Sequence, residues 1–194
     1  VFFCLSIIID LPMPLVAIQL LWINVVTDGI QDFALSFEKG EVGILDEKPK
    51  NPSESIFNKS LLKEILIAGL VTGIIVFIVW LYLIKYLHME ISLARGYIMA
   101  LMVFIQNIHV FNCRSESKSA FSVPIKNNPL VVGGVIISII LQILVMEVPF
   151  LSLFLQTSSI PIIHLIALFM IAVVVLIIME VYKLINPMIK KIID

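Results

Sequence analysis

Long apolar stretches, separated by short polar ones, make up most of this chain. A helix that crosses a bilayer needs about 20 largely apolar residues. Five segments meet or approach this length, and a sixth, at the start of the chain, is shorter. The pattern predicts an all-α polytopic membrane helix bundle, with one partial and five full transmembrane helices at about residues 1–10, 14–37, 60–87, 96–113, 129–148 and 160–185.

The composition supports a membrane protein. Hydrophobic residues make up 60% of the chain and charged residues only 14%, and the mean hydropathy is +1.11. A soluble domain carries about 25% charged residues. No basic stripe typical of nucleic-acid binding is visible. The expected partner is therefore the lipid bilayer, and nucleic acid is not expected to bind.

Two polar stretches, residues 38–59 and 114–128, are predicted to be loops outside the bilayer. Eleven of the 13 Lys and Arg residues lie in or beside these loops or in the C-terminal tail. The other two, Lys85 and Arg95, lie in a connection on the opposite side. Because basic residues concentrate on the cytoplasmic side of membrane proteins, we expect both loops and the C-terminus in the cytoplasm.

Polar residues interrupt the second apolar segment, in the run QLLWINVVTDG at residues 19–29. Asn24, Thr27 and Asp28 have the spacing i, i+3 and i+4, which puts their side chains on one face of a helix. An ionised Asp at mid-membrane costs at least ~2.5 kcal/mol, so such a residue usually has a function. Carboxylate, amide and hydroxyl oxygens are hard ligands, suited to Ca2+, Mg2+, Mn2+ or an alkali cation. Gly29 is expected to let the backbone leave helical geometry and free carbonyl oxygens for a cation.

A second set of polar residues lies in the fourth apolar segment, where Gln106, Asn107, His109 and Asn112 occur close together. Gln106, His109 and Asn112 repeat the i, i+3 spacing and so form one stripe. We expect Gln106 to be a cation ligand or to lie next to one. His109 is a further candidate ligand, but interhelical hydrogen bonding explains His109 and Asn112 at least as well.

Other intramembrane polar residues have competing explanations. Packing alone would account for Asp28 if its carboxylate paired with a polar group on a neighbouring helix. Asp32, one turn beyond Asp28, is a further candidate ligand that would line an access path, although a water-exposed helix end explains it equally well. Glu180 and Lys183, spaced i, i+3, are expected to pair with each other.

Motifs for nucleotide hydrolysis are absent from the sequence, which has no GxxxxGK[ST] and no GxGxxG. Each of these motifs would supply a backbone cradle for phosphate groups. This chain alone is therefore not expected to be catalytic.

The run at residues 19–29, with Leu11 and Pro12 before it, resembles the fifth-to-sixth membrane helix region of P-type cation-transporting ATPases of the calcium-pump group. The resemblance extends through DEKP at residues 46–49, similar to the family's proline-rich cytoplasmic loop, to EVYK at residues 180–183. It implies that residues 1–194 form the C-terminal transmembrane domain of such a pump, from the end of helix 5 through helix 10. A bacterial-type relative in the cell membrane is the implied source.

The resemblance also implies roles for individual residues. Asn24, Thr27 and Asp28 match the sixth-helix residues that coordinate the transported cation. Gln106 stands where other members place a glutamate ligand, which implies one ion site rather than two. Ca2+ export is the implied function, with Mn2+, Mg2+ and Na+ left open. ATP and Mg2+ would act through cytoplasmic domains of a longer parent chain, and these domains and its N-terminal helices would be the partners of this region.

A self-contained secondary cation transporter or channel subunit, with Asp28 relaying protons, is the alternative. Inverted internal repeats would favour it, but residues 24–29 have no counterpart in the second half of the sequence. A non-catalytic membrane scaffold is a third class, against which the intramembrane carboxylate argues.

Overall fold

Helices form all the regular secondary structure in the described part of the computed structural model, which covers residues 1–39, 59–115 and 119–193. Most of the loop predicted at residues 38–59 lies outside these ranges. The prediction of an all-α membrane helix bundle is confirmed. The elements are, in order, α1 (Phe2–Ile8), α2 (Ala17–Val26), α3 (Asp28–Leu35), α4 (Lys59–Leu81), η1 (Tyr82–Tyr86), α5 (Ile91–Cys113), η2 (Ala120–Ser122), η3 (Ile125–Asn127), α6 (Pro129–Glu147), α7 (Pro149–Phe154) and α8 (Ile162–Ile193).

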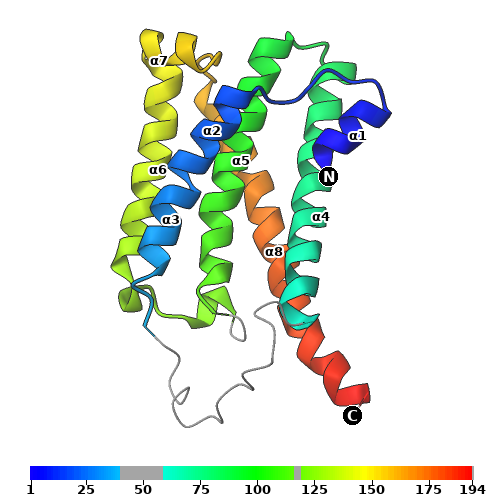
Figure 1. The fold of residues 1–194 in the computed structure, drawn as a ribbon, viewed down its shortest axis with the longest axis vertical. Coiled ribbons are helices and arrows are strands. Elements are labelled where there is room, and N and C mark those ends of the chain that lie inside the picture. Colours follow the sequence, from blue (N-terminus) through cyan, green and yellow to red (C-terminus); the bar gives the residue numbers. More distant parts are fainter. Residues whose placement is uncertain (40–58, 116–118, 194) are drawn as a thin grey trace.

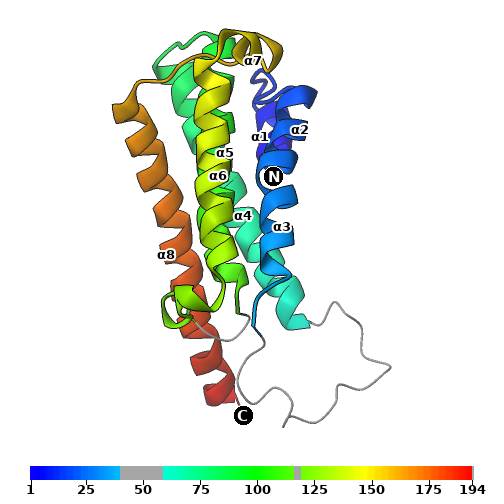
Figure 2. The ribbon, with the colours of Figure 1, turned by 90° about the vertical axis from the view of Figure 1, so that its left-hand side faces the viewer.

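Four helical stretches among the described residues are long and apolar enough to cross a membrane. They are Leu61–Tyr86, Ile91–Cys113, Pro129–Glu147 and Ile162–Ile185. The second predicted segment, at residues 14–37, is not one continuous helix. It consists of α2 and α3, which follow one another along the bundle (Figures 1 and 2) and are each too short to span it.

Several helix ends also differ from those expected from the apolar pattern. The helix α5 begins at Ile91 rather than near residue 96, because the apolar face continues through the turn before Arg95. The last turn before residue 87 forms the π-helix η1. The predicted connection between residues 148 and 160 contains the short helix α7, which begins with Pro149 at a position that favours proline.

Thr27 is the residue that separates α2 from α3. Its backbone angles, φ −109° and ψ −77°, depart from helical values. Its hydroxyl lies 2.7 Å from the carbonyl oxygen of Ile23, four residues earlier, a bond that bends helices. Gly29, where we expected the break, lies inside α3. The interruption is therefore located at a β-branched residue with a polar side chain, and not at the glycine.

The helix α5 lies at the centre of the bundle, in contact with α2, α3, α4, α6 and α8. In its most apolar window 67% of the residues are buried, whereas the other three candidate spans have 22–33%. Gly134 of α6 allows α3 to approach closely, because a Cβ atom there would lie 3.1 Å from the side chain of Ile30. The helices α2 and α3 thus pack along one side of the pair α5 and α6, as Figure 2 shows.

The outer faces of α4, α6 and α8 carry large exposed apolar side chains. Leu66, Ile137 and Ile163 are 55%, 52% and 65% exposed, respectively. Exposed apolar surface of this extent is typical of helices that face lipid. The outer faces of these three helices are thus suited to face lipid.

The ends of α3, α5 and α8 lie at one end of the bundle, together with the first turns of α4 and α6 (Figure 1). At this end Glu38 accepts two hydrogen bonds from the Arg114 guanidinium, at 2.9 and 2.8 Å. Arg114 also donates to the carbonyl oxygen of Pro124, at 3.0 Å. Asn128, which caps α6, donates to the carbonyl oxygen of Ala34. These bonds tie the end of α3 to the connection between α5 and α6.

Glu180 and Lys183 do not pair with each other, contrary to the expectation from their spacing. The Glu180 carboxylate accepts hydrogen bonds from the hydroxyl of Ser119 and from the backbone N–H of Ala120. The Lys183 ammonium donates to carbonyl oxygens at the end of α5, those of Asn112 at 2.7 Å and Ser115 at 2.8 Å. Carbonyls at a helix C-terminus are favourable partners for a cation, and the Lys183 ammonium also lies 4.0 Å from the carboxylate of Glu64 on α4.

Candidate cation site

Thr27 is the centre of the candidate site. Its side chain is fully buried at the junction of α2 and α3. The hydroxyl oxygen lies 2.6 Å from Oε1 of Gln106 on α5 and 3.4 Å from Oδ1 of Asp28. It also lies 2.7 Å from the carbonyl oxygen of Ile23. Three of the predicted ligands, Thr27, Asp28 and Gln106, are therefore close together.

The oxygens around the Thr27 hydroxyl outnumber the protons available. A hydroxyl carries one proton and can donate it to one acceptor, yet three oxygens lie within hydrogen-bonding distance of it. Rotating the Gln106 amide by 180° would place its NH2 group against the hydroxyl and relieve this conflict. A cation bound between the oxygens would relieve it equally well, because all of them are then acceptors toward the ion.

Asn24 and Asp32 are predicted ligands that remain outside this cluster. Asn24, Asp28 and Asp32 are all exposed, at intervals of four residues along α2 and α3. Within the described ranges neither the Asn24 amide nor the Asp32 carboxylate hydrogen bonds to Thr27 or Gln106. The polar residues of α2 and α3 thus differ in exposure: the Thr27 side chain is buried, whereas the Asp28 side chain is exposed.

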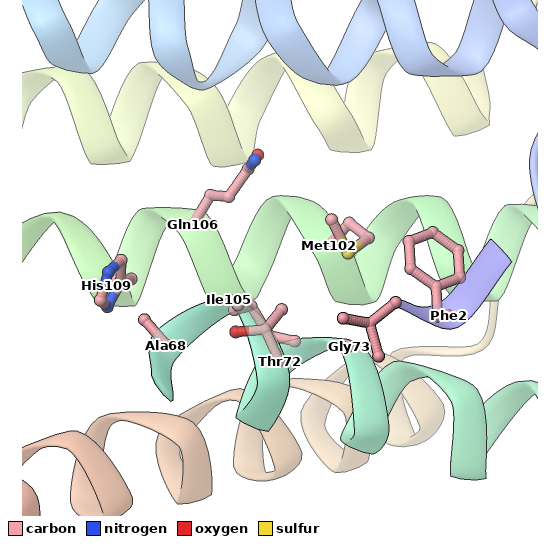
Figure 3. A pocket seen from close by; sticks show the side chains of 10 residues that line it. Phe2, Ala68, Thr72, Gly73, Met102, Ile105, Gln106 and His109 are labelled. Atoms are coloured by element: carbon pink, nitrogen blue, oxygen red, sulfur yellow. The ribbon is translucent and has the colours of Figure 1, made fainter. Parts of the chain in front are cut away.

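His109 lies one turn from Gln106 on α5 but does not join the Thr27 cluster. Both residues line a cavity of about 360 Å3 between α1, α4 and α5, together with Thr72 and Met102. Figure 3 shows that the Gln106 side chain points away from α4, toward the side on which α2 and α3 lie, whereas His109 stays beside α4. Nδ1 of His109 is buried and has no hydrogen-bond partner among the described residues.

The donor set of this site is one carboxylate with neutral oxygens. In the part of the chain that the structure describes, no three His, Cys, Asp or Glu side chains lie close enough together to hold a metal ion. Thiolate and imidazole ligands, which favour zinc or copper, are therefore not gathered anywhere in these ranges. Carboxylate, amide, hydroxyl and carbonyl oxygens suit hard cations.

Sequence reasoning missed a second polar cluster beside the first. Nε2 of Gln31 donates to Oδ1 of Asn107 at 2.8 Å, and Nδ2 of Asn107 donates to the Ser138 hydroxyl at 2.7 Å. The three residues, from α3, α5 and α6, are 5%, 1% and 0% exposed. Each was visible as a polar residue in an apolar segment, but only the relative rotation of three helices brings them into contact.

Comparisons with known proteins agree with the motifs. A family described as "Cation transporting ATPase, C-terminus" matches residues 12–185. A calcium-transporting ATPase of Bacillus subtilis is 33% identical over 155 residues, which are 80% of this chain and 17% of that protein. The human calcium-transporting ATPase type 2C member 1 is 30% identical over 183 residues, 92% of this chain and 19% of that protein.

A calcium-transporting ATPase of Listeria monocytogenes is 30% identical over 138 residues, or 70% of this chain and 15% of that protein. The chain thus spans less than a fifth of the length of these relatives. The family match covers nearly all of the chain, including the Thr27 and Gln106 helices. This chain belongs to the family of C-terminal membrane regions of P-type cation-transporting ATPases.

Proposed function

We propose that this chain forms the ion-binding membrane part of an ATP-driven pump that exports Ca2+ and binds one cation per transport cycle. The observation that carries the proposal is the convergence of the Thr27 hydroxyl, the Gln106 amide and the Asp28 carboxylate, with 2.6 and 3.4 Å between their oxygens. The names of the relatives support calcium as the cargo.

The ligand count supports a site that is completed by other parts of the pump. Ca2+ takes six to eight oxygen ligands, more than Thr27, Asp28 and Gln106 supply. Asn24 and Asp28 are exposed on the open side of α2 and α3, where further ligands can reach the ion. In this proposal Asn24 is a ligand when the ion is bound, and Asp32 lines the access path one turn nearer the helix end.

One divalent cation matches the charge of the cluster better than two. Among the described residues, Asp28 is the carboxylate that contacts Thr27. Two divalent cations that share a single anionic ligand would repel each other strongly in a low-dielectric site. The neutral Gln106 therefore favours a single site.

The interruption at Thr27 supports a transport role. Discontinuous helices place ion sites at their breaks in many transporters, and here the break and the ligand are the same residue. We infer that α2 and α3 tilt independently during transport and so change the distance between Thr27 and Gln106. The ATP-driven steps would occur in cytoplasmic domains, on the side of the loops at residues 38–59 and 114–128. The cell membrane of a bacterium is the proposed location.

The family relation favours this pump over a self-contained secondary transporter or channel. Transport into vesicles by the complete pump, measured against a panel of Ca2+, Mn2+, Mg2+ and Na+, tests the cargo. We expect ATP-dependent Ca2+ uptake. Uptake of another cation with no uptake of Ca2+ would contradict the assignment.

The site itself is tested by Asp28→Asn in the complete pump. We expect cation-dependent phosphorylation from ATP to be lost, because the amide no longer offsets the charge of a dehydrated cation. Asp10→Asn is the matched control: Asp10 is an exposed carboxylate in the connection after α1, with a positive φ that asparagine tolerates. Wild-type phosphorylation in the Asp28 variant would show that the site lies elsewhere.

A further inference from the structure

The hydrogen-bonded cluster of Gln31, Asn107 and Ser138 lies beside the candidate cation site and is not part of it. We propose that Asn107 is a positioning residue for cation binding: it holds α3 against α5 so that Thr27 and Gln106 stay together when an ion binds between them. This inference rests on the proposed cation site.

Two contacts connect the same pair of helical segments. Thr27 meets Gln106 at 2.6 Å, and Gln31 meets Asn107 at 2.8 Å. Along the broken helix the two contacts are four residues apart, or about 6 Å. On α5 they come from consecutive residues, which point about 100° apart around the helix axis. The cluster therefore contacts α3 from a second direction, close to the candidate cation site.

The Asn107 amide is fully engaged on both of its atoms. Its oxygen accepts from Gln31, and its nitrogen donates to the Ser138 hydroxyl and, at 2.8 Å, to the carbonyl oxygen of Val103 on its own helix. The last bond fixes the side chain on α5, and the other two reach α3 and α6. Because Gln31, Asn107 and Ser138 are at most 5% exposed, water does not compete for these bonds.

Cation binding changes the first contact and leaves the second intact. A bound Ca2+ lies about 2.3–2.6 Å from each ligand oxygen, so the Thr27 and Gln106 oxygens must turn toward the ion and give up their direct contact. The Asn107 cluster holds α3 beside α5 whether or not an ion is present. The ligand oxygens are therefore already positioned when the ion arrives, which should lower the cation concentration needed to fill the site.

The test is the half-saturating cation concentration for phosphorylation from ATP, measured on the complete pump. Asn107→Leu should raise this concentration about tenfold, since a buried hydrogen-bonded group is lost, and leave the maximal phosphorylation per folded pump unchanged. Asn112→Leu is the matched control. Asn112 lies on the same helix and is also 1% exposed, but its side-chain amide has no hydrogen-bond partner among the described residues.

A second variant keeps the test decisive if Asn107→Leu does not fold. Gln31→Leu removes the same bond from the side of α3 and should produce a similar shift. Combining the two substitutions should add little to either one, because both break one link. The exchange Gln31→Asn with Asn107→Gln rebuilds an amide pair of the same total length and should restore most of the affinity.

The possible outcomes separate this inference from the proposed function. An unchanged half-saturating concentration in folded Asn107 and Gln31 variants overturns the positioning role. The same holds if the variants lower only the maximal phosphorylation, which indicates a purely structural role. If the wild-type pump shows no cation-dependent phosphorylation at all, the proposed function fails instead.

Discussion

Gln106 and Asn107 are neighbours on α5, yet the polar clusters to which they belong differ in burial and in hydrogen bonding. The Thr27 cluster, to which Gln106 belongs, opens to the surface at Asp28. It has more oxygen acceptors than its one hydroxyl proton can serve. The Asn107 cluster is buried, and every side-chain atom of Asn107 that can hydrogen bond does so. A cluster with surplus oxygen acceptors and an open side is suited to bind a cation, whereas a satisfied, buried cluster is suited to hold helices together.

The cost of burial explains why the two clusters can coexist in one membrane region. A buried polar group without a partner costs free energy, so it is retained when it is hydrogen bonded or when it binds something. Asn107 meets the first condition within the described chain. Around Thr27, three oxygens compete for one hydroxyl proton, which is the physical reason to propose ion binding there.

Among the residues of the two clusters, we expect a substitution of Thr27 to have the largest effect on cation affinity. Thr27→Val keeps the shape of the side chain and removes an oxygen ligand, so the cation affinity of the complete pump should fall by between roughly 10- and 100-fold. Thr27→Ser keeps the hydroxyl and should stay close to wild type. Both are measured by the cation dependence of phosphorylation. Equal affinities of the Val and Ser variants would mean that the hydroxyl is not a ligand.

A smaller effect on stability should distinguish the satisfied amide from an unsatisfied one. Asn107→Leu leaves Gln31 and Ser138 without a shared partner and should destabilise the fold by about 1 kcal/mol. Asn112→Leu removes an amide that has no partner among the described residues and should be neutral or stabilising. Melting temperatures of the purified protein in detergent provide the measurement. The opposite order of the two variants would contradict the assignment of these bonds.

The smallest effect concerns pH and the end of α3, outside the spans. Hydrogen bonds from Arg114 lower the pKa of Glu38 below the usual glutamate range, although partial burial acts in the opposite direction. Because the pKa is lower in the folded state, the ion pair stabilises the protein fully above the usual glutamate pKa. This contribution is lost as the pH falls through the lowered value.

Glu38→Gln should therefore reduce the melting temperature modestly at neutral pH, and its difference from wild type should shrink in acid. Glu90→Gln, at an exposed glutamate before α5, is the control and should show no such trend. A difference between Glu38→Gln and wild type that stays constant with pH would mean that the Arg114 pair does not stabilise α3.

The local pattern of apolar residues predicted where the helices lie, but it did not predict where they are interrupted. The apolar segments near α4, α5, α6 and α8 were predictable because a bilayer demands long apolar helices. The break at Thr27 was expected at Gly29, since glycine is the usual sign of irregular backbone. Here a threonine side chain that bonds to its own helix and to Gln106 marks the break instead.

Candidate site residues were predictable by type, but their contacts were not. Thr27, Asp28 and Gln106 could be named because polar residues are rare in apolar spans. Asn24 shares their spacing, yet its side chain is exposed and takes no part in the hydrogen-bonded cluster. Their roles as ligands remain predictions for the experiments above.

By itself, the sequence determined the helical class, the order of the apolar segments, the family and the identity of the rare intramembrane polar residues. Only the tertiary structure decided which of these residues meet. Spacing along one helix fixes which side chains share a face, but the rotation of each helix about its axis depends on packing against all its neighbours. This is why Gln106 faces Thr27, Asn107 faces Gln31, and Lys183 turns to the end of α5 rather than to Glu180.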